Sequence, residues 1–192
     1  MEKGIPSTER QLPLLPRARP FAGIFLPGEN MARLTETQAG GANVLRFLDL
    51  IAFSEGTSTI RASDDGYNVL YGGGLFQGYA DHPRKKLTFR INGKPVTSTA
   101  AGRYQLLARY WEAYRVSLRL VGGFTPENQD RIALQQIRER EALDDIQANR
   151  IEEAIAKCSN IWASFPGNTY GQNPHRLEKL LAQWQKLGGV LA

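Results

Sequence analysis

The spacing of apolar residues predicts a mainly helical chain from residue 43 onward. Apolar positions recur at helical intervals after Asn43, a residue type that caps helices, and Gly56 is typical of a helix end. Proline directly after Thr125 favours another helix start, because a helix does not need the N–H that proline lacks there. The later helices are expected over 101–118, 125–140, 150–164 and 174–187.

The stretch between the first two predicted helices has a different pattern. Residues 61–98 contain short apolar segments separated by glycine-rich turns, and Leu87, Phe89 and Ile91 alternate with polar residues. Asn92-Gly93 follows directly, which predicts a β-hairpin, and Pro95 places the returning strand at an edge. The sequence therefore predicts an α+β fold, a mainly helical domain with a small β-hairpin lobe inserted after its first helix.

Residues 1–42 lack any helical or strand periodicity and are rich in proline. We interpret them as an N-terminal arm or linker, and residues 43–192 as the folded domain. An arm without a core of its own needs something to hold it, so it is expected to dock on the domain or on a partner protein. In another interpretation, the native start is Met31, because the codons of Gly28-Glu29 can form a ribosome-binding sequence upstream of it.

Composition narrows the class of protein. A chain of 192 residues with 42% hydrophobic residues is long enough for one well-packed domain. The single cysteine, Cys158, excludes an intramolecular disulfide, and no apolar stretch reaches the length of a membrane span or a signal peptide. The net charge of +5 is interpreted as spread along the chain; it suits approach to an anionic cell wall, weak nucleic-acid binding, or a solvated surface without a partner.

Most familiar catalytic motifs are missing, and one carboxyl group stands out. The sequence has no glycine-rich phosphate loop, no HExxH, and only two histidines, so neither a metal nor another cofactor is expected. Glu55 ends the first predicted helix where the chain enters the β-rich lobe. Partial burial there favours the protonated form that a general acid at a glycosidic oxygen needs; the alternative is an exposed residue at a helix end.

Several long segments identify a family resemblance. Residues 53–57 (FSEGT), 79–85 (YADHPRK), 101–107 (AGRYQLL) and 158–167 (CSNIWASFPG), with shorter matches at 133–137 and 170–172, resemble the phage lambda endolysin family. The resemblance covers residues 43–192. It implies a lysozyme-like fold with a substrate cleft between lobes and a lytic transglycosylase activity. Such an enzyme cleaves the MurNAc-β-1,4-GlcNAc bond of peptidoglycan glycan strands and forms 1,6-anhydro-MurNAc, with Glu55 acting as acid and then as base.

The resemblance also implies further substrate-binding residues. Gly102, Tyr104 and Gln105 are expected to line the cleft, Tyr170 and Gln172 to close it, and His82 to orient a loop or touch substrate. For Tyr104, Gln105 and His82 the alternatives are core packing, solvent exposure and a structural hydrogen bond, respectively. The three tryptophans are spaced as core residues and are assigned no sugar-binding role.

Two alternatives to a transglycosylase remain open. A hydrolytic lysozyme would need a second carboxylate, and Asp64 lies nine residues after Glu55, although Asp64-Asp65-Gly66 is equally typical of a turn. The second alternative is a virion-associated structural component that is anchored by the N-terminal arm. The endolysin interpretation places the protein in the host bacterial cytoplasm until a separate holin-type protein releases it to the periplasmic cell wall, with no membrane insertion and no nucleic-acid partner.

Overall fold

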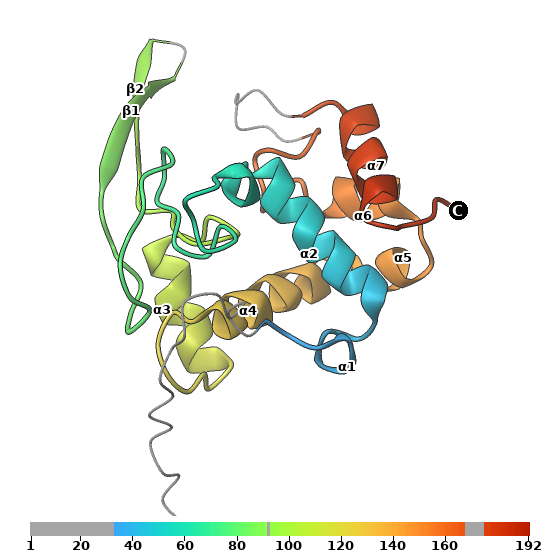
Figure 1. The fold of residues 1–192 in the computed structure, drawn as a ribbon, viewed down its shortest axis with the longest axis horizontal. Coiled ribbons are helices and arrows are strands. Elements are labelled where there is room, and N and C mark those ends of the chain that lie inside the picture. The colour runs from blue at the N-terminus through green and yellow to red at the C-terminus, as the bar shows by residue number, and fades with distance from the viewer. Residues whose placement is uncertain (1–32, 92, 168–174) are drawn as a thin grey trace, which may run out of the picture. The chain divides into compact units, whose positions relative to one another are not determined.

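The computed structural model describes residues 33–91, 93–167 and 175–192 (Figure 1). Its elements, in chain order, are α1 (Glu36–Ala39), α2 (Ala42–Ser54), η1 (Thr57–Thr59), β1 (Leu87–Ile91), β2 (Lys94–Ser98), α3 (Ala108–Ser117), α4 (Pro126–Glu139), α5 (Leu143–Gln147), α6 (Ile151–Cys158) and α7 (Leu177–Lys186). A mainly helical chain with one small antiparallel hairpin confirms the predicted α+β class. None of the helices in these ranges is long and apolar enough to cross a membrane.

Helix α2 is the central element of the helical part. It packs against α1, α4, α5 and α7 and runs through the middle of the helices in Figure 1. Most of its apolar residues are almost fully buried, including Phe47, Leu48 and Ile51. Since so much apolar surface fixes this helix, its C-terminal end is held rigidly in place.

The start of α2 differs from the prediction. Gly41, and not Asn43, is the N-cap, and Asn43 lies inside the helix. The Asn43 amide instead donates to the carbonyl of Ile146 and to Oδ1 of Asn149, so it joins α2 to the region of α5. The cap prediction was wrong because a long-range polar contact uses the side chain that a local cap would need.

The predicted helix over 101–118 was wrong in its first part. Residues 101–107 form a tight turn in which Ala101 and Leu106 exchange backbone hydrogen bonds of 3.0 and 2.9 Å, and α3 begins only at Ala108. Gly102 and Gln105 have φ angles of +81° and +50°, which no helix accommodates.

The other helix predictions are confirmed with changed bounds. Thr125 caps α4 by accepting a hydrogen bond from the Asn128 N–H, as its Thr-Pro start predicts. Helix α6 ends at Cys158, six residues before the predicted end at 164. Helix α5 was not predicted, because five residues are too few to show a helical period.

The hairpin prediction is confirmed. Strands β1 and β2 pair antiparallel with Phe89 opposite Val96 and Arg90 opposite Pro95. Because the sheet has two strands, Pro95 lies in an edge strand, as expected.

The packed part of the chain begins before the predicted boundary at residue 42. Leu34 is only 3% exposed, and its N–H donates to Oδ2 of the buried Asp130. A capping box between Thr35 and Gln38 starts α1. At least residues 33–41 therefore belong to the domain, and the prediction of an arm over residues 1–32 lies outside the described residues.

Candidate active site

Glu55 is the C-cap residue of α2. Its N–H donates to the carbonyl of Ile51 at 2.8 Å, and Gly56, with φ of +75°, turns the chain into η1. The left-handed conformation of Gly56 is one that glycine adopts without strain. The sequence thus places Glu55 where it was predicted, at the junction between a rigid buried helix and the β-rich lobe.

Two serines form a hydrogen-bond chain that ends on the Glu55 carboxyl group. The Ser54 hydroxyl donates to the Ser164 hydroxyl at 2.8 Å, and the Ser164 hydroxyl donates to Oε1 of Glu55 at 2.6 Å. Ser54 is the last residue of α2, whereas Ser164 follows α6. The chain therefore fixes the carboxyl group from a segment 109 residues away in sequence.

The environment of Glu55 favours its protonated form. Burial raises the pKa of Glu55 from 4.5 to about 7, although hydrogen bonds from the side chain and backbone of Ser164 act in the opposite direction. The position at a helix C-terminus also disfavours negative charge. A carboxyl group with this pKa exchanges a proton readily near neutral pH, as a general acid and base must.

His175 fastens the C-terminal segment to the same end of α2. Its Nε2 lies 3.1 Å from the Ser54 carbonyl, and its backbone N–H donates to the Ser164 carbonyl at 2.9 Å. The imidazole stacks on Phe53, with ring centroids 5.8 Å apart. These contacts hold Ser164 against the helix, so they position the hydroxyl that contacts Glu55.

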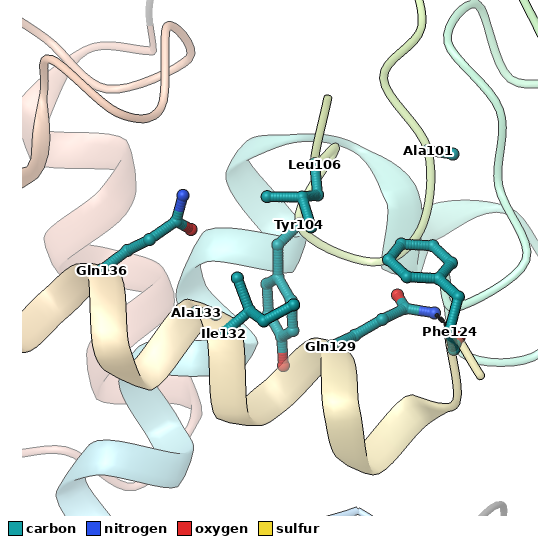
Figure 2. Close-up of a pocket in the computed structure, with 8 residues that line it drawn as sticks. All are labelled: Ala101, Tyr104, Leu106, Phe124, Gln129, Ile132, Ala133 and Gln136. Atoms are coloured by element: carbon teal, nitrogen blue, oxygen red, sulfur yellow. Dashed lines mark hydrogen bonds between the residues drawn. The ribbon is translucent and has the colours of Figure 1, made fainter. Parts of the chain in front are cut away.

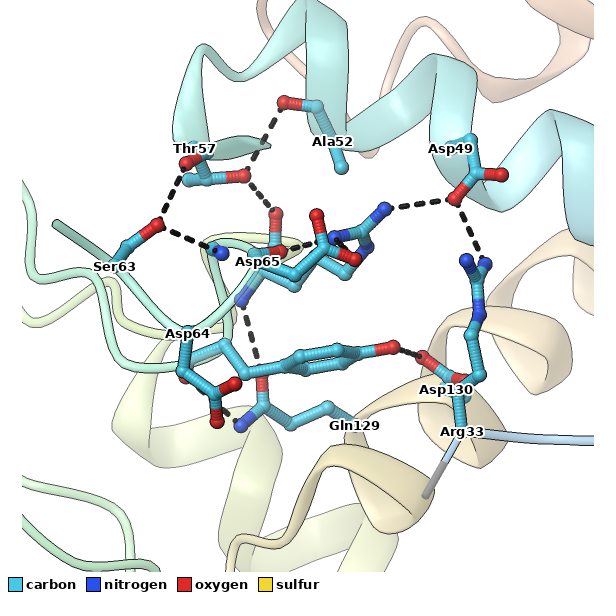
Figure 3. A network of polar contacts seen from close by, with 12 residues as sticks. Arg33, Asp49, Ala52, Thr57, Ser63, Asp64, Asp65, Gln129 and Asp130 are labelled. Carbon is cyan, nitrogen blue, oxygen red and sulfur yellow. Dashed lines mark hydrogen bonds and ion pairs between the residues drawn. The ribbon is translucent and has the colours of Figure 1, made fainter. Parts of the chain in front are cut away.

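A polar network that includes Asp49, Thr57 and Asp65 holds the other side of the turn after Glu55 (Figure 3). Arg103 is 2% exposed and forms ion pairs with Asp49 and Asp65, each at 2.7 Å. Its backbone carbonyl accepts a 2.6 Å hydrogen bond from Thr57, the first residue of η1. Arg33 also reaches Asp49 at 2.8 Å. The network connects α2, η1 and the 101–107 turn behind the candidate catalytic residue.

Asp64, the candidate second carboxylate, occupies a turn. Its Oδ2 accepts a 2.7 Å hydrogen bond from the Tyr79 hydroxyl, and its backbone N–H donates to Asn68. The following residues, Asp65 and Gly66, have positive φ angles. This arrangement fits the turn that was the alternative interpretation of the Asp64-Asp65-Gly66 sequence.

The structure gives Gly102 and Tyr104 roles in packing. Tyr104 is 5% exposed, and its hydroxyl donates to Oδ1 of Asp130 at 2.6 Å. A Cβ atom on Gly102 would lie 2.2 Å from Oε1 of Gln129. Figure 2 shows Tyr104 beside α4, the helix that carries Gln129, and no water-sized volume remains among the side chains drawn. Tyr104 therefore matches its alternative as a core residue.

Gln105 and His82 are also held by backbone groups. The Gln105 amide donates to the Gly102 carbonyl at 3.0 Å, within its own turn, and the residue is half-buried. His82 is 3% exposed; its Nε2 lies 2.9 Å from the Leu106 carbonyl, and its Nδ1 accepts from the Arg84 N–H. Both ring nitrogens of His82 are engaged, which matches the structural hydrogen-bonding alternative.

Two predicted residues lie outside the described residues, and two important ones were missed. Tyr170 and Gln172 belong to the segment 168–174, which the structure does not describe. Ser54 and Ser164 were not selected, although both lie within the segments 53–57 and 158–167 that carry the resemblance. Nothing in serine alone distinguishes a partner of a catalytic carboxyl group from a surface residue.

Comparisons with known proteins point to one family. The family model described as Endolysin matches residues 45–191. The chain is 51% identical over 147 residues to the endolysin of Escherichia phage lambda, covering 76% of this chain and 90% of that protein. It is 48% identical over 160 residues to the endolysin of Escherichia phage P2, covering 78% and 95%.

Comparison of the fold with solved structures gives the same family relationship. The structure of bacteriophage lambda lysozyme complexed with a chitohexasaccharide superposes with a TM-score of 0.73 at 45% identity, covering 84% of this chain and all of that one. A second structure of lysozyme from bacteriophage lambda gives a TM-score of 0.71. The chain has a lysozyme-like fold and belongs to the endolysin family.

Proposed function

We propose that this endolysin degrades peptidoglycan as a lytic transglycosylase, cleaving the MurNAc-β-1,4-GlcNAc bond and forming a 1,6-anhydro-MurNAc end. Family membership supports the coarser activity on peptidoglycan. The chitohexasaccharide in the lambda lysozyme complex has the same β-1,4 linkage between its sugars, which supports a glycan strand as the substrate. The observation that carries the proposal is the partly buried Glu55 carboxyl group at the end of α2, hydrogen-bonded to Ser164, with its pKa raised to about 7.

In the first step Glu55 is the acid. The protonated carboxyl group donates its proton to the glycosidic oxygen, and the bond from this oxygen to C1 of MurNAc breaks. GlcNAc leaves with a free 4-hydroxyl group. The Ser164 hydroxyl donates to Oε1 of Glu55 and holds the carboxyl group in place for this step.

In the second step Glu55 is the base. The carboxylate removes the proton from the C6 hydroxyl of the same MurNAc, whose oxygen attacks C1 and closes the 1,6-anhydro ring. The enzyme returns to its protonated form, and no water is consumed. Because the nucleophile belongs to the substrate, proximity within one sugar replaces a second enzyme carboxylate.

The contacts of Asp64 favour this reaction over hydrolysis. A hydrolytic lysozyme uses a second carboxylate to activate water or to stabilise positive charge at C1. Asp64, the candidate for that role, accepts the Tyr79 hydroxyl and forms part of a turn. These contacts favour a structural role for Asp64, with Glu55 as the single catalytic carboxyl group.

Mass spectrometry of digested peptidoglycan tests the proposal. We expect muropeptides that end in 1,6-anhydro-MurNAc, 18 Da lighter than the products of hydrolysis, since that is the mass of one water. Products with only reducing MurNAc ends would establish a muramidase instead. Digestion by Glu55→Gln, prepared in parallel, shows whether any product depends on this carboxyl group.

The biological setting belongs to the same proposal. We expect the protein to accumulate in the host cytoplasm and to reach the periplasmic cell wall after a separate holin-type protein permeabilises the membrane. The glycan strand is expected to pass the Glu55 end of α2, between the hairpin lobe and the helical part.

A further inference from the structure

The positive charge of the chain is concentrated in one stretch, so the expectation that it is spread along the sequence was wrong. Residues 82–111 contain seven Lys and Arg and no Asp or Glu. The rest of the chain has 17 Lys and Arg against 19 Asp and Glu. The net charge of +5 therefore comes from this stretch, which includes the β1–β2 hairpin.

Four of these cations lie exposed on or beside the hairpin. They are Lys85, Lys86, Arg90 and Lys94. In the described ranges 33–91, 93–167 and 175–192, no acidic side chain forms an ion pair with any of them. Arg84 differs, because Asp81 and Glu112 neutralise it. The hairpin and the two residues before it thus present four cations that pair with no carboxylate in the part of the chain that the structure describes.

The hairpin lies at the surface of the molecule and contributes little to the core. None of its residues with a described side chain is buried, and Figure 1 shows it projecting away from the helices. A two-stranded hairpin is marginally stable by itself, and one face of this one packs on the domain through Leu87 and Phe89. The exposed parts of the hairpin are free to meet a ligand.

An aromatic contact connects this surface to the Glu55 turn. Phe89 is 44% exposed, and its other side packs against Tyr71, with ring centroids 5.4 Å apart, and against Gly72. The next residue, Gly73, lies against Ile60, which follows directly on η1. The middle of strand β1 thus packs on the loop that continues from the turn carrying Glu55.

We infer that the hairpin, through Lys85, Lys86, Arg90 and Lys94, binds the carboxylates of peptidoglycan stem peptides. This inference rests on the proposed function, because it concerns the peptides attached to the same glycan strand. In intact peptidoglycan the carboxylates belong to these peptides, and the sugar rings carry neutral hydroxyl and acetamido groups. Lys and Arg side chains pair with carboxylates, and such pairs steer and orient a charged ligand.

Binding to insoluble cell-wall sacculi tests the inference without any reaction. The probe is full-length Glu55→Gln, alone or with Lys85→Gln, Lys86→Gln, Arg90→Gln and Lys94→Gln. We expect the four hairpin changes to weaken binding to untreated sacculi about tenfold at low ionic strength, since each exposed ion pair contributes little and four act together. The difference should shrink in about 0.5 M salt, where exposed charges are screened.

Two controls separate this surface from total charge. The first combines Arg119→Gln, Arg131→Gln, Arg138→Gln and Lys186→Gln, which removes four exposed cations elsewhere and should change binding less than twofold. The second uses sacculi whose carboxylates are converted to neutral amides, on which the hairpin variant and its parent should bind equally.

Each remaining outcome contradicts the inference. Equal loss in the two four-residue variants would mean that only net charge matters. Equal loss on untreated and amidated sacculi would mean that the hairpin does not bind carboxylates. Unchanged binding to sacculi, with lost binding to DNA or to anionic lipid vesicles, would assign the surface to another polyanion. The products of wild-type digestion test the transglycosylase proposal separately, so the two failures are distinguishable.

Discussion

The Ser164 hydroxyl donates a 2.6 Å hydrogen bond to Oε1 of Glu55, although the two residues are 109 positions apart in sequence. Charge on this carboxylate would strengthen the bond, so Ser164 lowers the pKa of Glu55 while burial raises it. The resulting pKa of about 7 is a balance between these two effects. Ser164 is therefore a positioning residue that also lowers the pKa of the proposed catalytic group.

Replacing Ser164 should move this balance in a known direction. In Ser164→Ala the side-chain hydrogen bond is lost and burial remains, so the pKa of Glu55 rises above about 7. Since the first step needs protonated Glu55, activity falls as pH rises through this pKa. We expect the alkaline limb of the pH–rate profile to move upward by about one pH unit, with a lower maximal rate because the carboxyl group is less well oriented.

Two matched variants serve as controls for Ser164→Ala. Ser164→Thr keeps the hydroxyl and should leave the alkaline limb in place. Ser159→Ala removes a nearby hydroxyl that donates to the Ala156 carbonyl in α6, and it should not shift the profile. An unshifted limb in Ser164→Ala, measured on protein with normal circular dichroism, would contradict the assigned role.

Gly102 is predicted to be required for folding rather than for contact with a sugar. Its φ is +81°, and an added Cβ would lie 2.2 Å from Oε1 of Gln129 and 2.9 Å from the ring of Phe124. Gln129 cannot move freely, because it accepts from the Arg103 N–H and donates to the Tyr67 and Phe124 carbonyls. We expect Gly102→Ala to reduce the free energy of unfolding by roughly 2–4 kcal/mol.

Gly122 supplies the comparison for this glycine. Its φ is +84°, but nothing lies within 4 Å of an added Cβ. Gly122→Ala should therefore show only the backbone cost of about 1 kcal/mol. Urea unfolding measures both variants, and equal losses would mean that the contact with Gln129 is unimportant.

The sequence predicted α2, α4 and the hairpin well because their signals are local. Thr125-Pro126 starts α4 and Asn92-Gly93 separates β1 and β2 whatever the rest of the fold does. The errors at Asn43 and over 101–107 have the opposite origin. Asn43 contacts Asn149, which lies over 100 residues away, and the 101–107 turn contacts Gln129, about 26 residues away. These distant contacts determine the local conformation.

The same distinction applies to the site. Glu55 could be found because its position at the end of an apolar helix is visible in the sequence, and the family resemblance selected it. Ser164 could not, because its role depends on the C-terminal segment returning to α2 through His175. The buried state of His82 and Tyr104 likewise depends on long-range packing against Phe124 and Asp130.

Variants of Tyr104 and Tyr67 test whether the Tyr104 hydroxyl serves the packing of the core or the binding of substrate. Both hydroxyls donate to Oδ1 of the buried Asp130, at 2.6 and 2.8 Å. Removing either hydroxyl leaves the buried Asp130 carboxyl group with one hydrogen bond fewer. Tyr104→Phe and Tyr67→Phe should therefore each lower the free energy of unfolding, measured in urea, by about 1–2 kcal/mol. The rate per folded molecule should stay unchanged in both, and a rate loss confined to Tyr104→Phe would assign its hydroxyl to the substrate.

The Glu55→Gln variant should be inactive and also more stable than the wild type near neutral pH. In the folded protein burial raises the pKa of Glu55 from 4.5 to about 7, so the unfolded chain releases this proton at a lower pH than the folded one. Wild-type stability therefore decreases as pH rises from about 4.5 to about 7, and the full cost is present above that range. Glutamine keeps the oxygen that accepts from Ser164 and has no proton to lose.

We expect the free energy of unfolding of Glu55→Gln to exceed that of the wild type by roughly 1–3 kcal/mol at pH 8 and to equal it at pH 4, as measured by urea unfolding at both values. The exposed Glu141→Gln controls for the same chemical change. An equal gain at both pH values would show that the substitution stabilises by packing, and no gain at pH 8 would mean that burial does not hold Glu55 in its protonated form.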